Sequence, residues 1–123
     1  MSIILIVDDS PIVRRTLGFT LKKSGYTVLE AAHGADALDK LAKTAVDLVI
    51  SDMTMPEVDG LTLLQRLRAD KRYKNLPVVM HTASGQNQDR LRAEQEGADG
   101  FLTKPASSRE LIAIASQFVN SSS

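Results

Sequence analysis

Three aspartates stand directly after two short apolar segments of the chain. Asp8 and Asp9 follow residues 3–7, and Asp52 follows residues 48–50 after a single serine. Such runs of aliphatic residues are typical of strands buried on both faces of a parallel sheet. Because ligand sites in these sheets lie beyond the carboxyl ends of the strands, the three carboxylates could converge there. Grouped carboxylates repel one another unless a cation or a proton intervenes, and Mg²⁺ prefers oxygen ligands, so we expect an acidic metal pocket.

The size and composition predict one ordinary globular domain. The 123 residues are 43% hydrophobic and 24% charged, and Lys plus Arg and Asp plus Glu each number 15, so the net charge favours neither nucleic acid nor membranes. The chain has no cysteine, which excludes disulfides and thiol chemistry. No apolar stretch approaches the roughly 20 residues that span a bilayer. We expect a cytoplasmic, monomeric or weakly associating domain over residues 1–120 and a flexible tail at 121–123.

Strand and helix patterns alternate five times along the chain. The expected strands cover residues 3–7, 26–32, 47–52, 77–82 and 101–103. The expected helices cover residues 11–24, the apolar stripes of 37–42 and 61–67, residues 88–96, and the segment after the Ser107 and Glu110 capping box. This alternation predicts a doubly wound α/β fold, a five-stranded parallel sheet between two helix layers. The first, third and fourth strands are the most apolar and should be central, in the order 2-1-3-4-5, partly by analogy with a common order of such folds.

Four motifs stand at the expected ends of these strands. They are Val7-Asp8-Asp9, the segment 51–56 followed by Asp59-Gly60, His81-Thr82-Ala83, and Lys104-Pro105. Each motif alone is weak, but together and in this order they are specific. With them the chain resembles the receiver domain of two-component response regulators over essentially its whole length, which implies a flavodoxin-like three-layer sandwich.

The resemblance implies a phosphoryl-accepting site. Asp52 would be the phosphoacceptor, taking a phosphoryl group from a sensor histidine kinase or a histidine phosphotransfer protein. Mg²⁺ would be held by Asp8, Asp9, Asp52 and the backbone carbonyl of Thr54. Lys104 would pair first with the carboxylate and then with a phosphoryl oxygen. The chain would be a regulatory phosphoacceptor and not an enzyme, although it would assist its own phosphorylation and dephosphorylation.

The resemblance also implies a switch. The hydroxyl of Thr82 would donate to the phosphoryl group and move toward Asp52, and Phe101 would rotate into the space behind it. Thr54 and Ser84 would tune the phosphoryl lifetime. The Lys104-Pro105 bond is expected to be cis. The fourth helix, in which Leu91 is the single large apolar residue, is expected to be poorly anchored and able to move.

Other residues with chemical potential have plainer interpretations. Strand alternation points His81 away from Thr82 and from the acidic pocket, as a packed or partner-facing residue, and His33 is expected in solvent. The basic residues at the end of the third helix suit the helix dipole better than nucleic acid; they are Arg66, Arg68, Lys71, Arg72 and Lys74. Ile12 and Phe19 lie off the inner stripe of the first helix and form either an exposed strip that docks a kinase or a partly buried one.

Several functions remain open on the sequence alone. The leading hypothesis is a phosphorylation switch that binds an unknown target protein through its fourth helix, fifth strand and fifth helix. One alternative is a Mg²⁺-dependent phosphohydrolase with an aspartate nucleophile, although hydrolases of the haloacid dehalogenase type carry a second aspartate where this chain has Thr54. Another is a receiver-like binding module that is never phosphorylated. A flavin binder fits the fold, but acidic strand ends would repel its phosphate. Dimerisation on phosphorylation stays open, as does whether the chain acts alone or within a longer protein.

Overall fold

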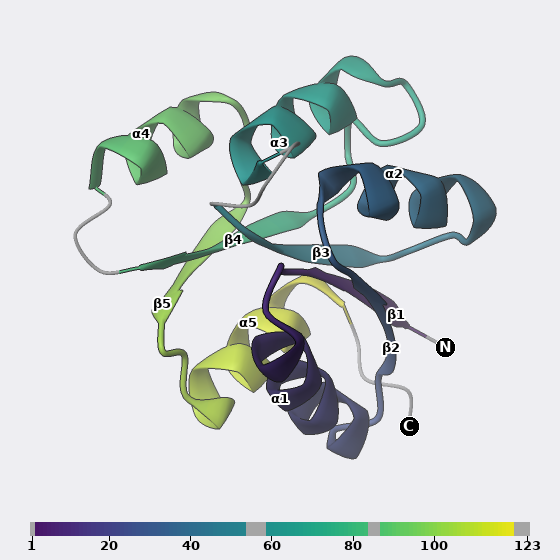
Figure 1. The fold of residues 1–123 in the computed structure, drawn as a ribbon, viewed down its shortest axis with the longest axis vertical. Helices are drawn as coiled ribbons and strands as arrows, with labels where there is room; N and C mark the ends of the chain where they lie inside the picture. Colours follow the sequence, from purple (N-terminus) through teal and green to yellow (C-terminus); the bar gives the residue numbers. More distant parts are fainter. Residues whose placement is uncertain (1, 54–58, 84–86, 120–123) are drawn as a thin grey trace.

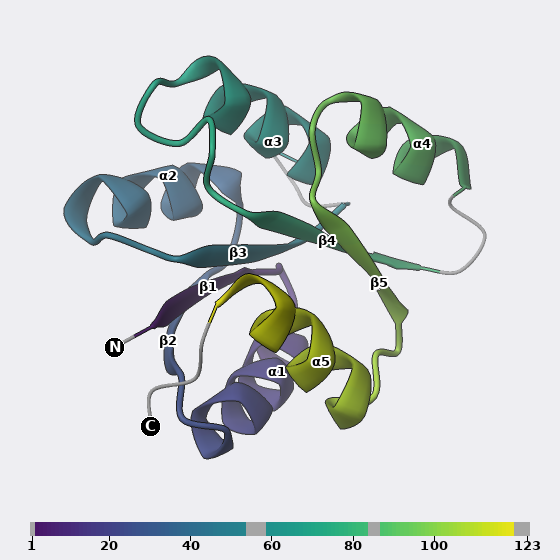
Figure 2. The ribbon, with the colours of Figure 1, turned by 180° about the vertical axis from the view of Figure 1, so that it is seen from behind.

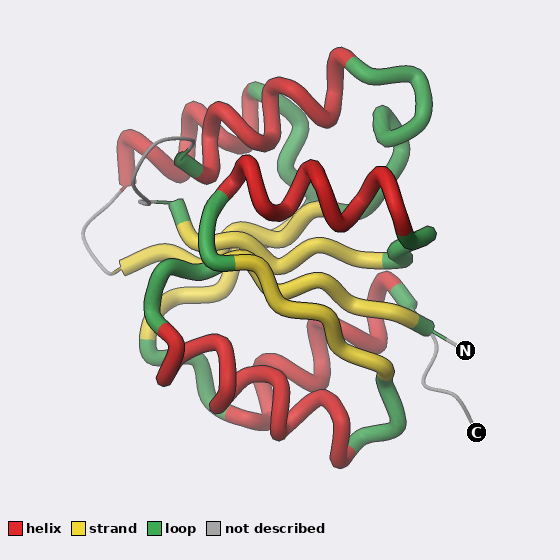
Figure 3. Tube along the Cα trace, turned by 45° about the vertical axis from the view of Figure 1, so that its right-hand side comes forward, coloured by secondary structure: helices red, strands yellow, loops and turns green. Residues whose placement is uncertain are grey.

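A five-stranded sheet lies between two layers of helices in the computed structural model, which describes residues 2–53, 59–83 and 87–119 (Figures 1 and 3). The strands are β1 (Ile3–Val7), β2 (Thr27–Ala31), β3 (Leu48–Asp52), β4 (Val78–Ala83) and β5 (Gly100–Lys104). The helices are α1 (Pro11–Lys23), α2 (Gly34–Lys43), α3 (Gly60–Ala69), α4 (Asn87–Gln95) and α5 (Ser108–Phe118). Among the described residues, no helix has the length and apolar character needed to cross a membrane.

All neighbouring strands run parallel, in the order β2-β1-β3-β4-β5. This confirms the predicted order, with the mixed strand β2 and strand β5 at the edges, although β5 has five residues and is not shorter than β1. Val7 at the end of β1 pairs with Ser51, and Asp52 at the end of β3 pairs with His81 of β4. The carboxyl ends of β1 and β3 therefore lie side by side, where the direction of chain winding reverses.

The sheet separates two hydrophobic clusters. The helices α2, α3 and α4 cover one face, and α1 and α5 cover the other (Figures 1 and 2). Alternate residues of one strand enter different clusters: Leu5 packs with α2 and α3, whereas Ile4 and Ile6 pack with α1 and α5. Because both faces are covered, the central strands are apolar at almost every position, which is the pattern seen in the sequence.

Local signals set the ends of the helices. The Ser10 hydroxyl accepts a hydrogen bond from the Val13 amide at 3.3 Å and caps α1, which is followed by Gly25 at a φ of +98°. Ser107 and Glu110 form the predicted capping box at the start of α5. The far end of α5 is joined to the start of β2, where the Tyr26 hydroxyl donates to the Val119 carbonyl at 3.3 Å.

Two predictions about exposure need correction or detail. His33 is half-buried and not solvent-exposed, because its Nδ1 accepts the Asp36 amide at 3.2 Å and caps α2. In α4, Leu91 is 56% exposed, and among the side chains of this helix that the structure describes the buried one is Ala93. The apolar contact of α4 with the core is thus made by the small Ala93 methyl and not by Leu91, and the weak anchoring of this helix stays a prediction. On α1, Ile12 and Phe19 are 74% and 64% exposed. Of the two alternatives for these residues, an exposed strip or a partly buried one, the structure has the exposed strip.

Arg68 connects three segments rather than merely complementing a helix dipole. Its guanidinium donates to the carbonyls of Gly97, Tyr73 and Leu76 at 2.8–3.1 Å and to Asp99 Oδ2 at 2.8 Å. Asp99 Oδ2 in turn accepts the Val78 amide at 2.9 Å. The end of α3 is therefore tied to the segments that lead into β4 and β5.

Candidate functional site

The three predicted carboxylates converge at the carboxyl ends of β1 and β3. Asp8, Asp9 and Asp52 each place an oxygen within 4.8 Å of the others. Asp8 and Asp52 are buried and Asp9 is exposed, so the cluster opens to solvent on one side. Asp8 is held by the Ser10 amide, which donates to its Oδ1 at 2.9 Å. The residue that caps α1 thereby also positions a carboxylate of the cluster.

Asp8 carries an oxygen that suits a cation. Its Oδ2 is buried and accepts no hydrogen bond in the described part of the chain. Burial raises the pKa of Asp8 above its ordinary value, the Ser10 amide opposes this rise, and the negative charges of Asp52 and Asp9 add to it. Buried carboxylate oxygens of this kind are the ligands that a hard divalent ion such as Mg²⁺ prefers. The residues present therefore fit a divalent metal site.

Lys104 supplies the positive charge of the cluster. It is the last residue of β5, and its Nζ donates to Asp52 Oδ1 at 3.0 Å and lies 3.6 Å from Asp8 Oδ2. Burial favours loss of its proton, but the hydrogen bond and charge of Asp52, with the charge of Asp8, outweigh burial and raise the pKa of Lys104. The ammonium group is thus a permanent counter-ion for two carboxylates. The bond from Lys104 to Pro105 is cis, as predicted.

The predicted switch residues, Thr82 and Phe101, lie on the side of the sheet that α2, α3 and α4 cover. Thr82 is buried near the end of β4, and Phe101 is partly buried against the cluster under α2, α3 and α4. The Arg90 guanidinium of α4 stacks 4.7 Å from the centre of the Phe101 ring. The predicted ligand Thr54 and the rate-tuning residues Thr54 and Ser84 lie outside the described residues.

His81 is closer to the site than the sequence prediction placed it. Val79, two residues earlier on β4, faces α1 and α5, as do Ile50 and Leu102, which precede Asp52 and Lys104 by two residues. Strand alternation therefore sets His81 opposite to Thr82 but on the same face as Asp52 and Lys104. This shared face could have been predicted by following alternate residues along β3, β4 and β5 to Asp52, His81 and Lys104.

His81 is also held neutral. Burial, with the positive charge of Lys104, lowers the pKa of His81 to about 4, while the charge of Asp52 opposes the shift. Both ring nitrogens are buried and have no hydrogen-bond partner within the described ranges. The side chain is thus packed, as expected, but its polar atoms remain unsatisfied.

Comparison with known proteins agrees with this geometry. Residues 4–116 match the response regulator receiver domain. The chain is 40% identical over 110 residues to the DNA-binding dual master transcriptional regulator RpaA of Synechocystis sp., covering 89% of this chain and 46% of that protein. It is 46% identical over 112 residues to the response regulator Rre1 of the same organism, covering 90% and 48%. The chain spans about half the length of these two relatives.

Shorter relatives match over most of their length. The chain is 40% identical over 104 residues to the chemotaxis protein CheY1 of Helicobacter pylori, covering 83% of this chain and 84% of that protein. The solved structure of chemotaxis protein CheY4 of Vibrio cholerae superposes with a TM-score of 0.91 at 33% identity, covering 97% of this chain and 99% of the other. With the strand order, the acidic ends of β1 and β3 and the lysine at the end of β5 all accounted for, this chain belongs to the response regulator receiver domain family.

Proposed function

We propose that this chain is a phosphorylation-dependent switch in which Asp52 accepts a phosphoryl group from a histidine of a sensor kinase or a histidine phosphotransfer protein. The observation that carries this proposal is the convergence of three carboxylates with one lysine. Lys104 Nζ lies 3.0 Å from Asp52 Oδ1, and Asp52 ends the strand beside β1, which presents Asp8. A buried carboxylate between a metal site and a fixed cation is well placed to react with a phosphate dianion that it would otherwise repel.

Transfer of the phosphoryl group from the donor's histidine to Asp52 needs no further reagent. One carboxylate oxygen of Asp52 forms a bond to phosphorus, the bond between phosphorus and the donor's imidazole nitrogen breaks, and its electron pair stays on that nitrogen. The products are an acyl phosphate on Asp52 and an unphosphorylated histidine. Lys104, already paired with Asp52, would follow the negative charge onto a phosphoryl oxygen.

The metal and the remaining residues have separate tasks. Asp8, Asp9 and Asp52 would hold Mg²⁺, with the Thr54 carbonyl as a further ligand, and the ion would neutralise charge on the phosphoryl oxygens. Thr82 would donate its hydroxyl to the phosphoryl group. Ser84 and Thr54 would set how long the acyl phosphate lasts.

Switching would pass from Thr82 to the face formed by α4, β5 and α5. A Thr82 hydroxyl drawn toward Asp52 would leave space on the α4 side of the sheet, where Phe101 packs. Because the Arg90 guanidinium lies over the Phe101 ring, rotation of Phe101 would also release or move Arg90. The exposed residues of α4 would thus report the state of Asp52 to a target protein.

Phosphorylation of the intact chain tests the proposal. The wild type, Asp52→Asn and the exposed control Asp39→Asn are incubated with acetyl phosphate and Mg²⁺ and weighed by mass spectrometry. The expected result is one phosphoryl adduct, labile to hydroxylamine, on the wild type and on Asp39→Asn but not on Asp52→Asn. An equal adduct on Asp52→Asn would overturn the assignment of the phosphoacceptor.

A second measurement applies if the chain accepts a phosphoryl group only from its kinase and not from acetyl phosphate. Beryllium fluoride with Mg²⁺ mimics the acyl phosphate and needs no phosphoryl donor. We expect it to shift the amide resonances around Thr82 and Phe101 in the wild type but not in Asp52→Asn. No adduct and no shift would favour the module that is never phosphorylated. Steady hydrolysis of a generic phosphomonoester, abolished in Asp52→Asn, would favour the phosphohydrolase.

A further inference from the structure

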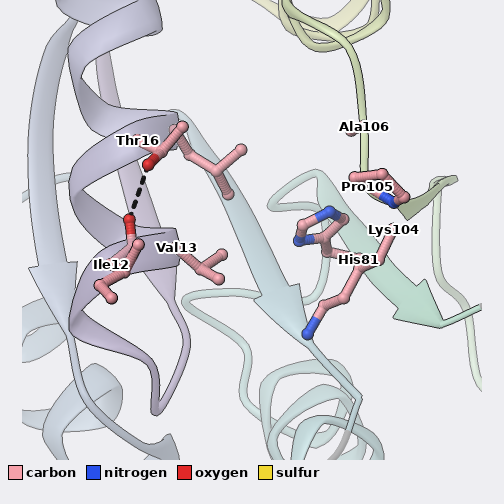
Figure 4. A pocket seen from close by; sticks show the side chains of 8 residues that line it. Ile12, Val13, Thr16, His81, Lys104, Pro105 and Ala106 are labelled. Atoms are coloured by element: carbon pink, nitrogen blue, oxygen red, sulfur yellow. Dashed lines mark hydrogen bonds between the residues drawn. The ribbon is translucent and has the colours of Figure 1, made fainter.

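A cavity of about 210 Å³ lies between α1 and the segment that joins β5 to α5. Its wall is almost entirely apolar and comes from three parts of the fold (Figure 4). The residues that define it are Val13, Thr16, Leu17, His81, Pro105 and Ala106. Ile12, which is 74% exposed, stands at its rim, so the cavity can be entered from solvent.

The imidazole of His81 is the unsatisfied polar group of this wall. The Thr16 hydroxyl is occupied, because it donates to the Ile12 carbonyl at 2.8 Å (Figure 4). Lys104 borders the cavity with its stem, and its ammonium group is paired with Asp52. His81, in contrast, is 4% exposed and has no partner for Nδ1 or Nε2 in the part of the chain that the structure describes. A buried polar group without a partner costs free energy, so a matching ligand group would be favoured.

We propose that this cavity binds a small molecule with a single apolar ring and one hydroxyl group, which hydrogen-bonds to His81. The volume lies below the roughly 300–1,000 Å³ of sites for drug-sized ligands and suits one ring, since an apolar cavity of about 150 Å³ already admits benzene. The apolar wall supplies the contacts to the ring. The imidazole has a donor and an acceptor nitrogen and can pair with a hydroxyl in either sense.

The depth of His81 favours a small molecule over a protein surface. Because the side chain is only 4% exposed and both ring nitrogens are buried, a ligand hydroxyl can reach them only by entering the cavity and displacing neighbouring side chains slightly, not by resting on α1. The inference does not rest on phosphorylation of Asp52. The two sites share Lys104, which contacts Asp52 with its ammonium group and borders the cavity with its stem.

Titration with two probes of similar shape tests the proposal. The ¹⁵N-labelled chain is titrated with phenol and, separately, with toluene, which lacks the hydroxyl group. We expect phenol to shift the amide resonances of Val13, Thr16, Leu17 and Ala106 and the ring nitrogens of His81. One net hydrogen bond predicts that toluene binds about fivefold more weakly.

Variants at the two histidines complete the test. His81→Leu removes both ring nitrogens at similar volume and should weaken phenol binding about fivefold, to the level of toluene. The control His33→Asn keeps a cap for α2 and should bind phenol like the wild type. If His81→Leu does not fold, the His81 ring nitrogens of the wild type decide, since a hydrogen bond from phenol must shift one of them by far more than the ring current of bound toluene does. Equal affinities for the two probes, shifts confined to other surfaces, or undiminished phenol binding by His81→Leu would overturn the proposal.

Discussion

The Nζ atom of Lys104 lies 3.0 Å from Oδ1 of Asp52, although β4 separates the strands that carry the two residues. The same ammonium group is 3.6 Å from Asp8 Oδ2. One side chain therefore compensates two buried carboxylates, and it lies where the charge of a metal ion would also act. Lys104 and a divalent cation thus compete for the same negative charge.

Lys104→Met should make the metal-free protein less stable and its metal binding tighter. Without the ammonium group, the repulsion between Asp8 and Asp52 is uncompensated, and we expect the free energy of unfolding to fall by about 1–2 kcal/mol, because Lys104 is partly exposed. The affinity for Mg²⁺ should rise about fivefold. Urea denaturation and calorimetric Mg²⁺ titration measure the two effects, and Lys71→Met, at an exposed site, is the control. Weaker Mg²⁺ binding by Lys104→Met would contradict this competition.

Asp8→Asn should stabilise the metal-free protein and weaken Mg²⁺ binding. The raised pKa of Asp8 means that its charged form is disfavoured in the folded state, so wild-type stability falls as the pH rises from the ordinary aspartate pKa through the raised one. An asparagine removes this loss and can still accept the Ser10 amide. We expect a gain of about 1 kcal/mol at neutral pH by urea denaturation without metal. A loss of stability in Asp8→Asn would show that the Ser10 amide and Lys104 stabilise the charged carboxylate by more than its burial costs, and would contradict this prediction.

The lowered pKa of His81 should make stability depend on pH. Between about 4 and 6.5 the unfolded histidine binds a proton and the folded one does not. The free energy of unfolding should therefore fall by about 3 kcal/mol as the pH is lowered through this window, and the contribution of His81 should be constant above it. His81→Leu lacks this dependence, so the difference between the two unfolding curves isolates it from the opposite effect of Asp8. A difference that does not change with pH would contradict the burial of a neutral imidazole.

Gly60 should be intolerant of a side chain because α3 begins against the end of β3. An added Cβ would overlap the Asp52 carbonyl oxygen and lie 2.8 Å from Met80 Cε. We expect Gly60→Ala to lose about 2–3 kcal/mol of stability and to disturb the acidic site. Gly18→Ala is the control: its Cβ would meet Val28 at an ordinary 3.4 Å, and the helix should gain about 0.5–1 kcal/mol. Thermal or urea unfolding of both variants checks this, and similar stabilities would refute it.

Arg68→Lys should be far more harmful than the same change at Arg66. A lysine keeps the charge but cannot donate at once to Gly97, Leu76 and Asp99, as the guanidinium does. We expect a loss of about 1–3 kcal/mol for Arg68→Lys and less than about 0.5 kcal/mol for Arg66→Lys, which is exposed. Urea denaturation measures the stability of the two variants. Equal losses would mean that the several hydrogen bonds of the Arg68 guanidinium contribute nothing to stability.

Much of the fold could be predicted because the signals are local. The capping residues of α1 and α5 and the apolar runs of β1 and β3 each depend on neighbours in sequence. The strand order could then be predicted from packing rules for parallel sheets and partly by analogy with a common order of such folds, and the acidic cluster follows from that order. The place of Lys104 was implied by the family resemblance and not by any local pattern.

The features that escaped prediction depend on distant partners. The acceptors of Arg68 include groups 29 and 31 residues away. The position of His81 beside Asp52 and Lys104 could be predicted only by considering the alternation of side chains on β3, β4 and β5 together. In α4, the rotation of the helix buries Ala93 and exposes Leu91, although apolar size alone favours the reverse.

The strand order and the bond from Tyr26 to Val119 have a consequence for folding during synthesis. Residues 3–52 contain three strands that are neighbours in the finished sheet, so they can associate before the rest of the chain leaves the ribosome. The strands β4 and β5 then add one at a time to a single growing edge. Only α5 must return to the beginning, where it covers α1 and meets Tyr26, 93 residues back. This long-range closure should be the late, slow event that ends the exposure of the apolar face of α1.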